Sequence, residues 1–214
     1  NKLFSFVDDK TIFYHPVEKY EGEILEAFAD PDAPDLRHVA WTNKVVDSWN
    51  DKIRDYIYGH DREEWVRGED IVTTAPVFSE FEDEIIFNTD TLLTIQKEPE
   101  TVVKHDVECW KLRCKNKSLY VLKKTSNKEF AVKKQLLLTA AKADKKKWRD
   151  FYEFMETFAY IKPAHSLTVH RSQGSTFDDV YVSFANILAN PARKESLQCL
   201  YVAATRPRDR LILV

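Results

Sequence analysis

The sequence is poor in glycine, and the scarcity excludes two common nucleotide-binding loops. It has four glycines among 214 residues, at positions 22, 59, 68 and 174. A Walker-A loop needs two glycines five positions apart followed by Lys and Ser or Thr, and a dinucleotide-binding fingerprint needs three closely spaced glycines. Neither pattern occurs. We therefore expect that these residues alone do not hold the phosphates of a nucleotide in either familiar way.

Cysteine and long apolar runs are scarce as well. Three cysteines are too few, and odd in number, for a disulfide framework, which favours a reducing intracellular setting. Cys109 and Cys114 lack a second pair of ligands, so the sequence predicts no metal site. No apolar run reaches the length of a membrane span and no secretory signal opens the chain. We expect a cytoplasmic protein without a membrane partner.

The residues that are present form an ordinary globular composition. Hydrophobic residues make up 43% and charged residues 31% of the chain, which excludes a disordered protein. The length suffices for one large domain or two small ones. The net charge of −3 does not indicate a nucleic-acid-binding protein, although a mildly acidic protein can still carry a local binding groove. Composition leaves the partner open.

The two ends of the chain have the pattern of α/β structure. Apolar residues at helical spacing predict helices, and short buried apolar runs predict strands. The predicted helices cover 18–29, 44–58 and 194–205. The predicted strands cover 10–14, 36–42, 166–169, 179–184 and 210–214.

The middle of the chain has a different pattern, with short strand-like runs between polar breaks. The predicted strands there cover 69–78, 85–96, 107–114, 118–124 and 130–138. Short strands at this spacing are typical of a small antiparallel barrel. A helix is predicted next, over 140–159. A β-rich insert at 68–160 thus interrupts an α/β domain formed by 1–67 and 161–214.

Two segments hold the candidate chemistry. Residues 167–178 predict a strand that ends in a polar turn with hydroxyls, an imidazole, an amide side chain and one glycine. Such a turn can present donors to phosphate oxygens. Residues 200–211 place arginines at the end of a helix just before a strand, where a fixed guanidinium can reach a phosphate bidentately.

In order and in separation, these segments resemble motifs V and VI of superfamily 1 helicases, and we call them the motif V segment and the motif VI segment. Residues 39–43 resemble motif IVa of the same family. Further similarity at 42–50 and 68–88 points to the RecD-like/Dda-like (5′-to-3′) branch. The resemblance is weak before His38 and between about Pro99 and Tyr160. It implies an α/β fold, namely a RecA-like (P-loop NTPase-like) domain 2A with an inserted small SH3-like β-barrel, 2B.

The resemblance also implies roles for residues near a nucleotide. Arg206 matches the motif VI arginine, which reaches the γ-phosphate of ATP as an arginine finger. Gln173 and Gly174 match motif V residues close to the nucleotide. A helix-end ion pair for Arg206 and an ordinary turn glycine at Gly174 are the structural alternatives. Arg208 and Arg210 are expected to pair with carboxylates such as Asp209.

A second set of residues is matched to the backbone of single-stranded DNA. Hydroxyl, imidazole and guanidinium groups can bond phosphate oxygens without reading the sequence. A packed histidine, a solvated arginine and a helix cap are the structural alternatives for members of this set. Its members are Thr168, His170, Arg171, Thr42 and Asn43.

The function implied by the resemblance is that of the C-terminal half of an ATP-dependent DNA helicase. ATP and Mg²⁺ would be bound mainly by an N-terminal RecA-like domain that carries the Walker-A lysine, so we expect the fragment alone to be inactive. The expected partners are single-stranded DNA and that domain, in a monomeric enzyme of DNA replication, repair or recombination in a bacterial cell or phage-infected host. The alternative is a non-catalytic single-stranded nucleic-acid-binding or protein-docking domain derived from a helicase.

Overall fold

The computed structural model describes residues 11–13, 17–79 and 84–214. The chain separates into two compact units, one formed by the residues up to Asp61 together with Ala164–Val214, and the other by Arg62–Pro163. We call them unit 1 and unit 2. The predicted insert at 68–160 lies inside unit 2. No helix in the part of the chain that the structure describes combines the length and apolarity that a membrane crossing demands.

Unit 1 is built on a parallel sheet of five strands, in the order β1-β13-β12-β2-β11. Because every strand is parallel, all carboxyl ends lie at one edge of the sheet and all amino ends at the other. The strands are β1 (Thr11–Phe13), β2 (Leu36–Ala40), β11 (Ser166–Thr168), β12 (Phe177–Val182) and β13 (Pro207–Leu213). The strands predicted in unit 1 are therefore present with shifted bounds; residues 10 and 14 of the first lie outside the described residues.

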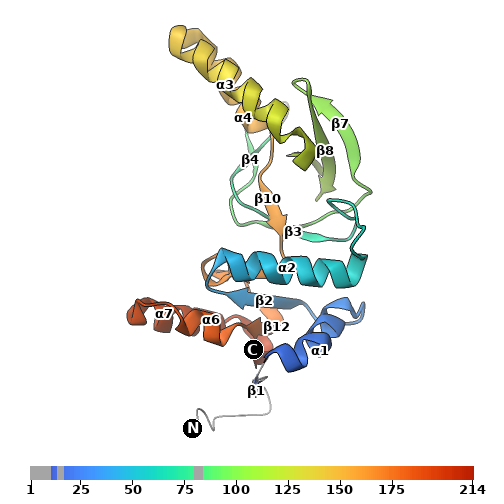
Figure 1. The fold of residues 1–214 in the computed structure, drawn as a ribbon, viewed down its shortest axis with the longest axis vertical. Helices are drawn as coiled ribbons and strands as arrows, with labels where there is room; N and C mark the ends of the chain where they lie inside the picture. The colour runs from blue at the N-terminus through green and yellow to red at the C-terminus, as the bar shows by residue number, and fades with distance from the viewer. Residues whose placement is uncertain (1–10, 14–16, 80–83) are drawn as a thin grey trace. The chain divides into compact units, whose positions relative to one another are not determined.

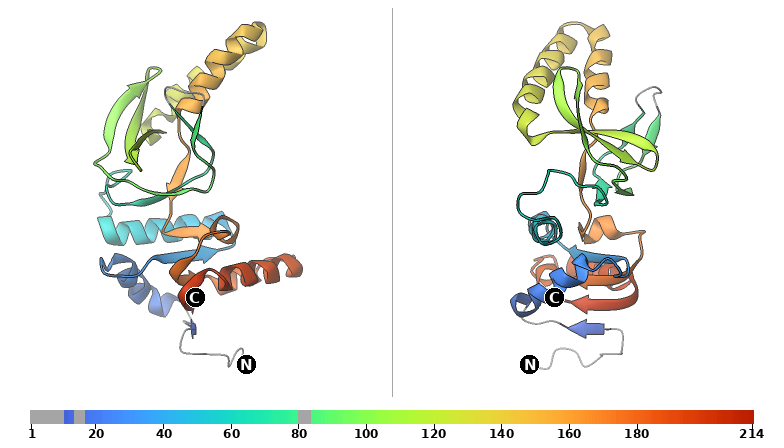
Figure 2. Two further views of the ribbon diagram at one scale, coloured as in Figure 1. Left: turned by 180° about the vertical axis from the view of Figure 1, so that it is seen from behind. Right: turned by 90° about the vertical axis from the view of Figure 1, so that its right-hand side faces the viewer.

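Helices cover both faces of this sheet (Figures 1 and 2). Helices α1 (Val17–Ala29) and α2 (Asn43–Tyr58) cover one face. Their buried side chains pack against inward-facing residues of the central strands, in a cluster of Ile24, Leu36, Trp49, Ile53, Tyr181, Ile212 and Val214. The other face is covered by the short α5 (Val169–Ser172), α6 (Phe184–Leu188) and α7 (Arg193–Ala204). The predicted α/β fold is confirmed, and the short helices α5 and α6 are additions to it.

Unit 2 contains three small antiparallel sheets, ordered β10-β3-β6, β4-β5 and β7-β8-β9. Strand β8 alternates between two cores, with Trp110 and Leu112 in one and Val107 and Cys109 in the other. This alternation is the period of two that a strand imposes on its side chains. The strands are β3 (Asp70–Thr73), β4 (Val77–Phe78), β5 (Ile85–Phe87), β6 (Leu92–Thr94), β7 (Glu100–Lys104), β8 (Val107–Cys114), β9 (Lys117–Leu122) and β10 (Ile161–Pro163).

The strand predicted over 130–138 is wrong, because these residues belong to helix α3 (Asn127–Ala143). Phe130, Leu137 and Ala141 recur at helical spacing and are the side chains that α3 turns inward. The single helix predicted over 140–159 is also wrong. The chain turns extended at Asp144, passes through a 3-10 turn at Lys145–Lys147, and resumes as α4 (Trp148–Thr157).

Helices α3 and α4 pack together through an aromatic cluster. The rings of Phe130 and Phe154 stack with centroids 5.1 Å apart, and Phe158 meets both of them edge-on. This cluster covers Val107 and Cys109, which lie on one face of β8. A further 3-10 turn, Lys124–Ser126, leads from β9 into α3.

Candidate functional site

The predicted DNA-binding residues follow two neighbouring strands. Thr168 ends β11 and is in register with Ala40, the last residue of β2. The residues that follow these positions therefore lie at the same carboxyl edge of the parallel sheet. In open α/β sheets, ligands bind outside this edge. The structure thus brings Thr42 and Asn43 to the same edge as Thr168, His170 and Arg171.

Thr42 is held by several polar contacts at the start of α2. Its Oγ1 accepts a bond from the Val45 amide at 3.4 Å and caps the helix. The Asn186 Oδ1 accepts from the amides of Trp41 at 2.8 Å and Thr42 at 3.2 Å. Asn43 is exposed and is the first residue of the helix, so the helix cap is Thr42 and not Asn43.

The motif V segment turns sharply after β11. Thr168 is buried, and its Oγ1 accepts from the Arg171 amide at 3.3 Å, which caps the one-turn helix α5. The cap uses the hydroxyl that was matched to DNA. Arg171 is half-buried, whereas His170 is exposed. Of these three side chains, His170 is the one most open to a ligand.

Gln173 and Gly174 lie on the connection that returns the chain to the amino edge for β12. Both residues are exposed. Gly174 has φ +88°, a left-handed conformation that other residues adopt at a cost, and no atom beyond its two chain neighbours lies within 4 Å of the position a Cβ would take. The turn therefore offers an open backbone surface, to which a phosphate could approach closely.

Arg206 lies just before β13, at the same amino edge. Its Nη1 donates to the Ser175 carbonyl oxygen at 2.9 Å, its Nε to the Val202 carbonyl oxygen at 3.0 Å, and its Nη2 to Thr205 Oγ1 at 3.0 Å. The backbone adds a bond from the Phe177 amide to the Arg206 carbonyl oxygen at 3.1 Å. These bonds join the motif V and motif VI segments into one unit.

The other two arginines of the motif VI segment lie in β13 and are paired with carboxylates. Arg208 contacts Asp178 at 3.2 Å, and Arg210 forms an ion pair with the buried Asp179. Pairing with carboxylates such as Asp209 was predicted, and the partners are Asp178 and Asp179. Both pairs link β13 to its neighbour β12, so they stabilise the sheet near Arg206.

Buried polar residues fix the edge strand β11. Asn50 of α2 bonds both backbone groups of Ser166, accepting at 2.8 Å and donating at 3.0 Å. The fully buried His38 lies between the hydroxyls of Ser166, at 2.7 Å, and Ser183, at 2.9 Å. Burial lowers the pKa of His38 to about 3, so the imidazole is neutral at physiological pH. These contacts support the strand that leads into the motif V segment.

A cavity of about 840 Å³ opens between α5 and α7. His170 and Gln173 line it together with Glu195 and Cys199 of α7. Burial raises the pKa of the Cys199 thiol, and the Glu195 carboxylate raises it further. Neither Glu195 nor Cys199 was among the site residues predicted from the sequence. The two residues are four positions apart on a predicted helix, and this spacing indicated that they share a face. That His170 lies beside them depends on the packing of α5 on α7, which the sequence did not predict.

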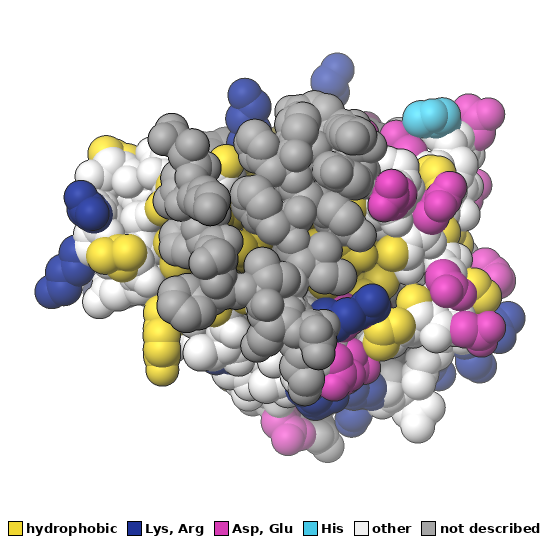
Figure 3. All heavy atoms as spheres, turned by 90° about the horizontal axis from the view of Figure 1, so that it is seen from below, with side chains coloured by type: hydrophobic (Ala, Val, Ile, Leu, Met, Phe, Trp, Pro, Cys, Tyr) yellow, Lys and Arg dark blue, Asp and Glu magenta, His cyan; other side chains and the backbone are white. Residues whose placement is uncertain are grey.

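One end of unit 1 is acidic. Figure 3 shows carboxylate side chains gathered on the side where Figure 1 places α1. The exposed acidic residues of this region are Glu23, Glu26, Asp30 and Asp32. A phosphate backbone is repelled from this end, whereas the candidate DNA-binding residues lie on other elements, after β2 and β11.

Comparison with known proteins finds a family model that matches the C-terminal part of the chain. Residues 163–214 match the family model described as UvrD-like helicase C-terminal domain. The ATP-dependent DNA helicase dda of Enterobacteria phage T4 is 28% identical over 200 residues, covering 80% of this chain and 45% of the phage protein. An uncharacterized protein of Acanthamoeba polyphaga mimivirus is 39% identical over 59 residues, which cover 28% of this chain and 12% of that protein.

A solved structure of Pif1 helicase from Bacteroides, in complex with ADP-AlF3 and single-stranded DNA, covers 91% of this chain at a TM-score of 0.45 and 12% identity. This chain covers 45% of that structure. The chain thus spans less than half the length of the curated relatives it matches.

Proposed function

We propose that this chain, which is related to the Dda-like superfamily 1 helicases and carries their UvrD-like C-terminal domain in residues 163–214, is the C-terminal motor part of an ATP-dependent DNA helicase. Unit 1 would be the RecA-like domain 2A, and unit 2 the inserted domain 2B with an SH3-like barrel. The enzyme would translocate on single-stranded DNA and unwind duplex in the 5′-to-3′ direction, as a cytoplasmic monomer.

The nucleotide side of this proposal rests on the amino edge of β12 and β13. The open turn at Gly174 and the anchored guanidinium of Arg206 suit contact with the phosphates of an ATP that is held from the opposite side. An N-terminal RecA-like domain of the same protein would supply the Walker-A lysine and the carboxylates for Mg²⁺. Arg206 would then stabilise the charge that develops on the transferred phosphoryl group.

Helix α7 offers a surface on which that domain could pack. Leu197 and Tyr201 lie one turn apart on α7, and their exposed fractions are 57% and 72%. Both residues line the cavity that also contains Gln173. Large apolar side chains exposed in this way are typical of a protein contact. Packing of the N-terminal domain against Leu197 and Tyr201 would bring its nucleotide to Gln173 and Gly174.

The proposed DNA-binding surface lies at the carboxyl edge of β2 and β11. His170 would bond the DNA backbone through its exposed imidazole, and Arg171 through charge. Asn43 offers an exposed amide at the start of α2, whereas Thr42 and Thr168 would act mainly by capping the two helices that present these groups. ATP-driven closure of the two RecA-like domains would shift the strand, and hydrolysis would reopen them.

The observation that carries the proposal is the link between Arg206 and Ser175, which joins two segments that match a helicase family in sequence. The test is ATP hydrolysis, with and without single-stranded DNA, by the 214-residue chain and by the full-length product of its gene. We expect DNA-stimulated turnover in the full-length product only. Forked duplexes with a 5′ or a 3′ tail then test the direction of unwinding.

Fluorescence anisotropy with a labelled single-stranded oligonucleotide tests the DNA face separately. We expect His170→Ala and Arg171→Ala to weaken binding, and Lys52→Ala, which removes an exposed lysine paired with Glu21 on α1, to leave it unchanged. A full-length product that binds DNA through these residues but never hydrolyses ATP would contradict the motor and would support a non-catalytic binding domain.

A further inference from the structure

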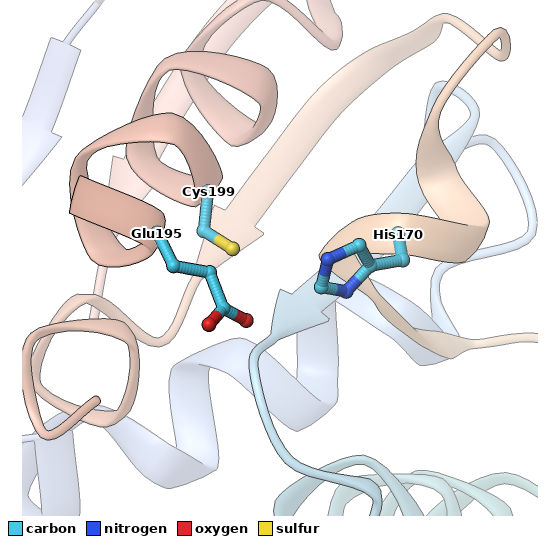
Figure 4. Close-up of side chains that lie close together, drawn as sticks. All are labelled: His170, Glu195 and Cys199. Atoms are coloured by element: carbon cyan, nitrogen blue, oxygen red, sulfur yellow. The ribbon is translucent and has the colours of Figure 1, made fainter. Parts of the chain in front are cut away.

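Three side chains of different chemistry converge on the cavity between α5 and α7. His170 extends from α5, and Glu195 and Cys199 extend from consecutive turns of α7 (Figure 4). Their ligand atoms, an imidazole nitrogen, a carboxylate oxygen and the thiol sulfur, all lie within 4.8 Å of one another. The cluster therefore extends from solvent into the protein. His170 is exposed, Glu195 is half-buried, and the Cys199 thiol is buried.

We propose that His170, Glu195 and Cys199 form a Zn²⁺ site. Zinc takes nitrogen, oxygen and sulfur ligands in tetrahedral geometry, at about 2.0–2.3 Å. Ligand atoms around such an ion are separated by roughly 3.3–3.8 Å, so these three atoms need to approach by about 1 Å. The exposed imidazole and the long Glu195 side chain can make that movement by rotation about their own χ angles, without a change in the helices. The fourth position faces the cavity and would hold a water molecule.

The charge of these ligands suits a divalent cation, and their chemistry favours zinc over Mg²⁺ and Ca²⁺. A zinc ion with one thiolate, one carboxylate and a neutral imidazole has no net charge. That neutrality matters because Arg193 and Lys194 also line the cavity and would repel a cation that kept its charge. Mg²⁺ and Ca²⁺ prefer sites rich in oxygen, whereas the thiol and imidazole select a softer ion.

Zinc binding has a defined proton balance. The metal ligand is the thiolate, so the Cys199 thiol loses its proton as the sulfur–zinc bond forms, and that proton passes to the buffer. No oxidant or reductant takes part. His170 would hold zinc through one ring nitrogen, which leaves the other for the DNA backbone. The inference does not depend on the proposed motor function, because zinc binding is measured without DNA or nucleotide.

The test is metal titration of the 214-residue chain. Zn²⁺ affinity is measured by competition with a chromophoric chelator, and Co²⁺ is used as a coloured substitute. We expect one equivalent of metal, a thiolate-to-cobalt charge-transfer band and the visible absorption of a tetrahedral site. Millimolar Mg²⁺ should not displace the metal. Cys199→Ser should abolish the charge-transfer band, and His170→Ala and Glu195→Gln should each weaken Zn²⁺ binding at least about tenfold.

The chain provides its own matched controls. Cys109 and Cys114 are free, buried thiols in unit 2, so Cys109→Ser and Cys114→Ser should keep the band and the affinity. If Cys199→Ser does not fold, the variants at the exposed His170 and the half-buried Glu195 still test whether the site binds zinc. The proposal is overturned if no saturable binding occurs, if the band persists in Cys199→Ser, or if neither His170→Ala nor Glu195→Gln changes the affinity.

Discussion

Arg206 Nη1 donates to the carbonyl oxygen of Ser175 across 2.9 Å, which fixes the position of a side chain predicted to act on a nucleotide. Bonds from Nε to Val202 and from Nη2 to Thr205 hold the same guanidinium. Three of its five N–H groups are engaged within unit 1, so two remain for a ligand. An arginine held in this way does not need to be ordered when its ligand arrives, which favours binding to a developing charge.

The first prediction concerns that arginine. In the full-length gene product, Arg206→Ala should lower ATP turnover by about 10³-fold or more, because an arginine finger supplies charge only in the transition state. Arg206→Lys should not rescue turnover, since one ammonium group cannot reach all three oxygen acceptors. Steady-state ATPase kinetics measure both effects.

Arg208→Ala is the matched control for Arg206→Ala, because Arg208 is exposed and pairs with Asp178 in the same segment. It should leave turnover within a few-fold of the wild type. Circular dichroism confirms that each variant is folded. Equal losses in Arg206→Ala and Arg208→Ala would contradict a special role for Arg206.

The second prediction concerns Gly174. Gly174→Ala should destabilise the fold by about 1–2 kcal/mol, because φ is +88° and a Cβ is disfavoured in that conformation. No atom lies within 4 Å of the Cβ position, so steric clash adds nothing. Gly22→Ala is the control with the opposite sign. Gly22 lies inside α1, also with no atom within 4 Å, and alanine should stabilise that helix by about 0.5–1 kcal/mol. Urea unfolding midpoints measure both changes, and a neutral Gly174→Ala would contradict the backbone argument.

Local patterns predicted unit 1 well and unit 2 less well. Strands buried on both faces, such as β2 and β12, appear in the sequence as continuous apolar runs, and the resemblance located the motif V and motif VI segments. The failure over 130–138 has a physical cause. Val132 and Leu136 are each 66% exposed, and together with Phe130 and Leu138 they imitate the alternation of a strand. The pattern that indicates a helix is the helical spacing of Phe130, Leu137 and Ala141, which are the side chains that α3 buries.

Contacts between distant segments could not be predicted from local patterns. The convergence of His170 with Glu195 and Cys199 depends on how α5 packs on α7, and neither helix encodes that packing by itself. The partner of Arg206 is similar, since the Ser175 carbonyl oxygen is a backbone atom with no sequence signature. The contact between Asn50 and the Ser166 backbone is of the same kind, since the sequence predicts only that Asn50 belongs to a helix.

The third prediction concerns Asn50, which is 2% exposed and bonds both backbone groups of Ser166. Asn50→Ala should cost about 2–4 kcal/mol, because it leaves two buried backbone groups without their partner. Asn127→Ala, at an exposed residue with one bond to the Lys124 carbonyl oxygen, should cost about 0.5 kcal/mol or less. Urea unfolding compares the two, and equal costs would show that β11 is held by other contacts.

The fourth prediction concerns the pH dependence of stability that His38 imposes. Burial lowers its pKa from 6.5 to about 3 in the folded chain, while the unfolded chain keeps the ordinary value. Between these pH values the unfolded state binds a proton that the folded state does not, so stability is complete above about pH 6.5 and falls as the pH drops towards 3. The slope from this group is about 1.4 kcal/mol per pH unit.

His38→Gln should remove that contribution while keeping a side chain that can bond Ser166 or Ser183. Between pH 7 and pH 5, the variant should lose about 2 kcal/mol less stability than the wild type. Urea unfolding at the two pH values measures the difference. Parallel profiles for His38→Gln and the wild type would mean that the fold does not lower the pKa of His38. At pH 5 its bonds to Ser166 and Ser183 would then have to be donated by an imidazolium.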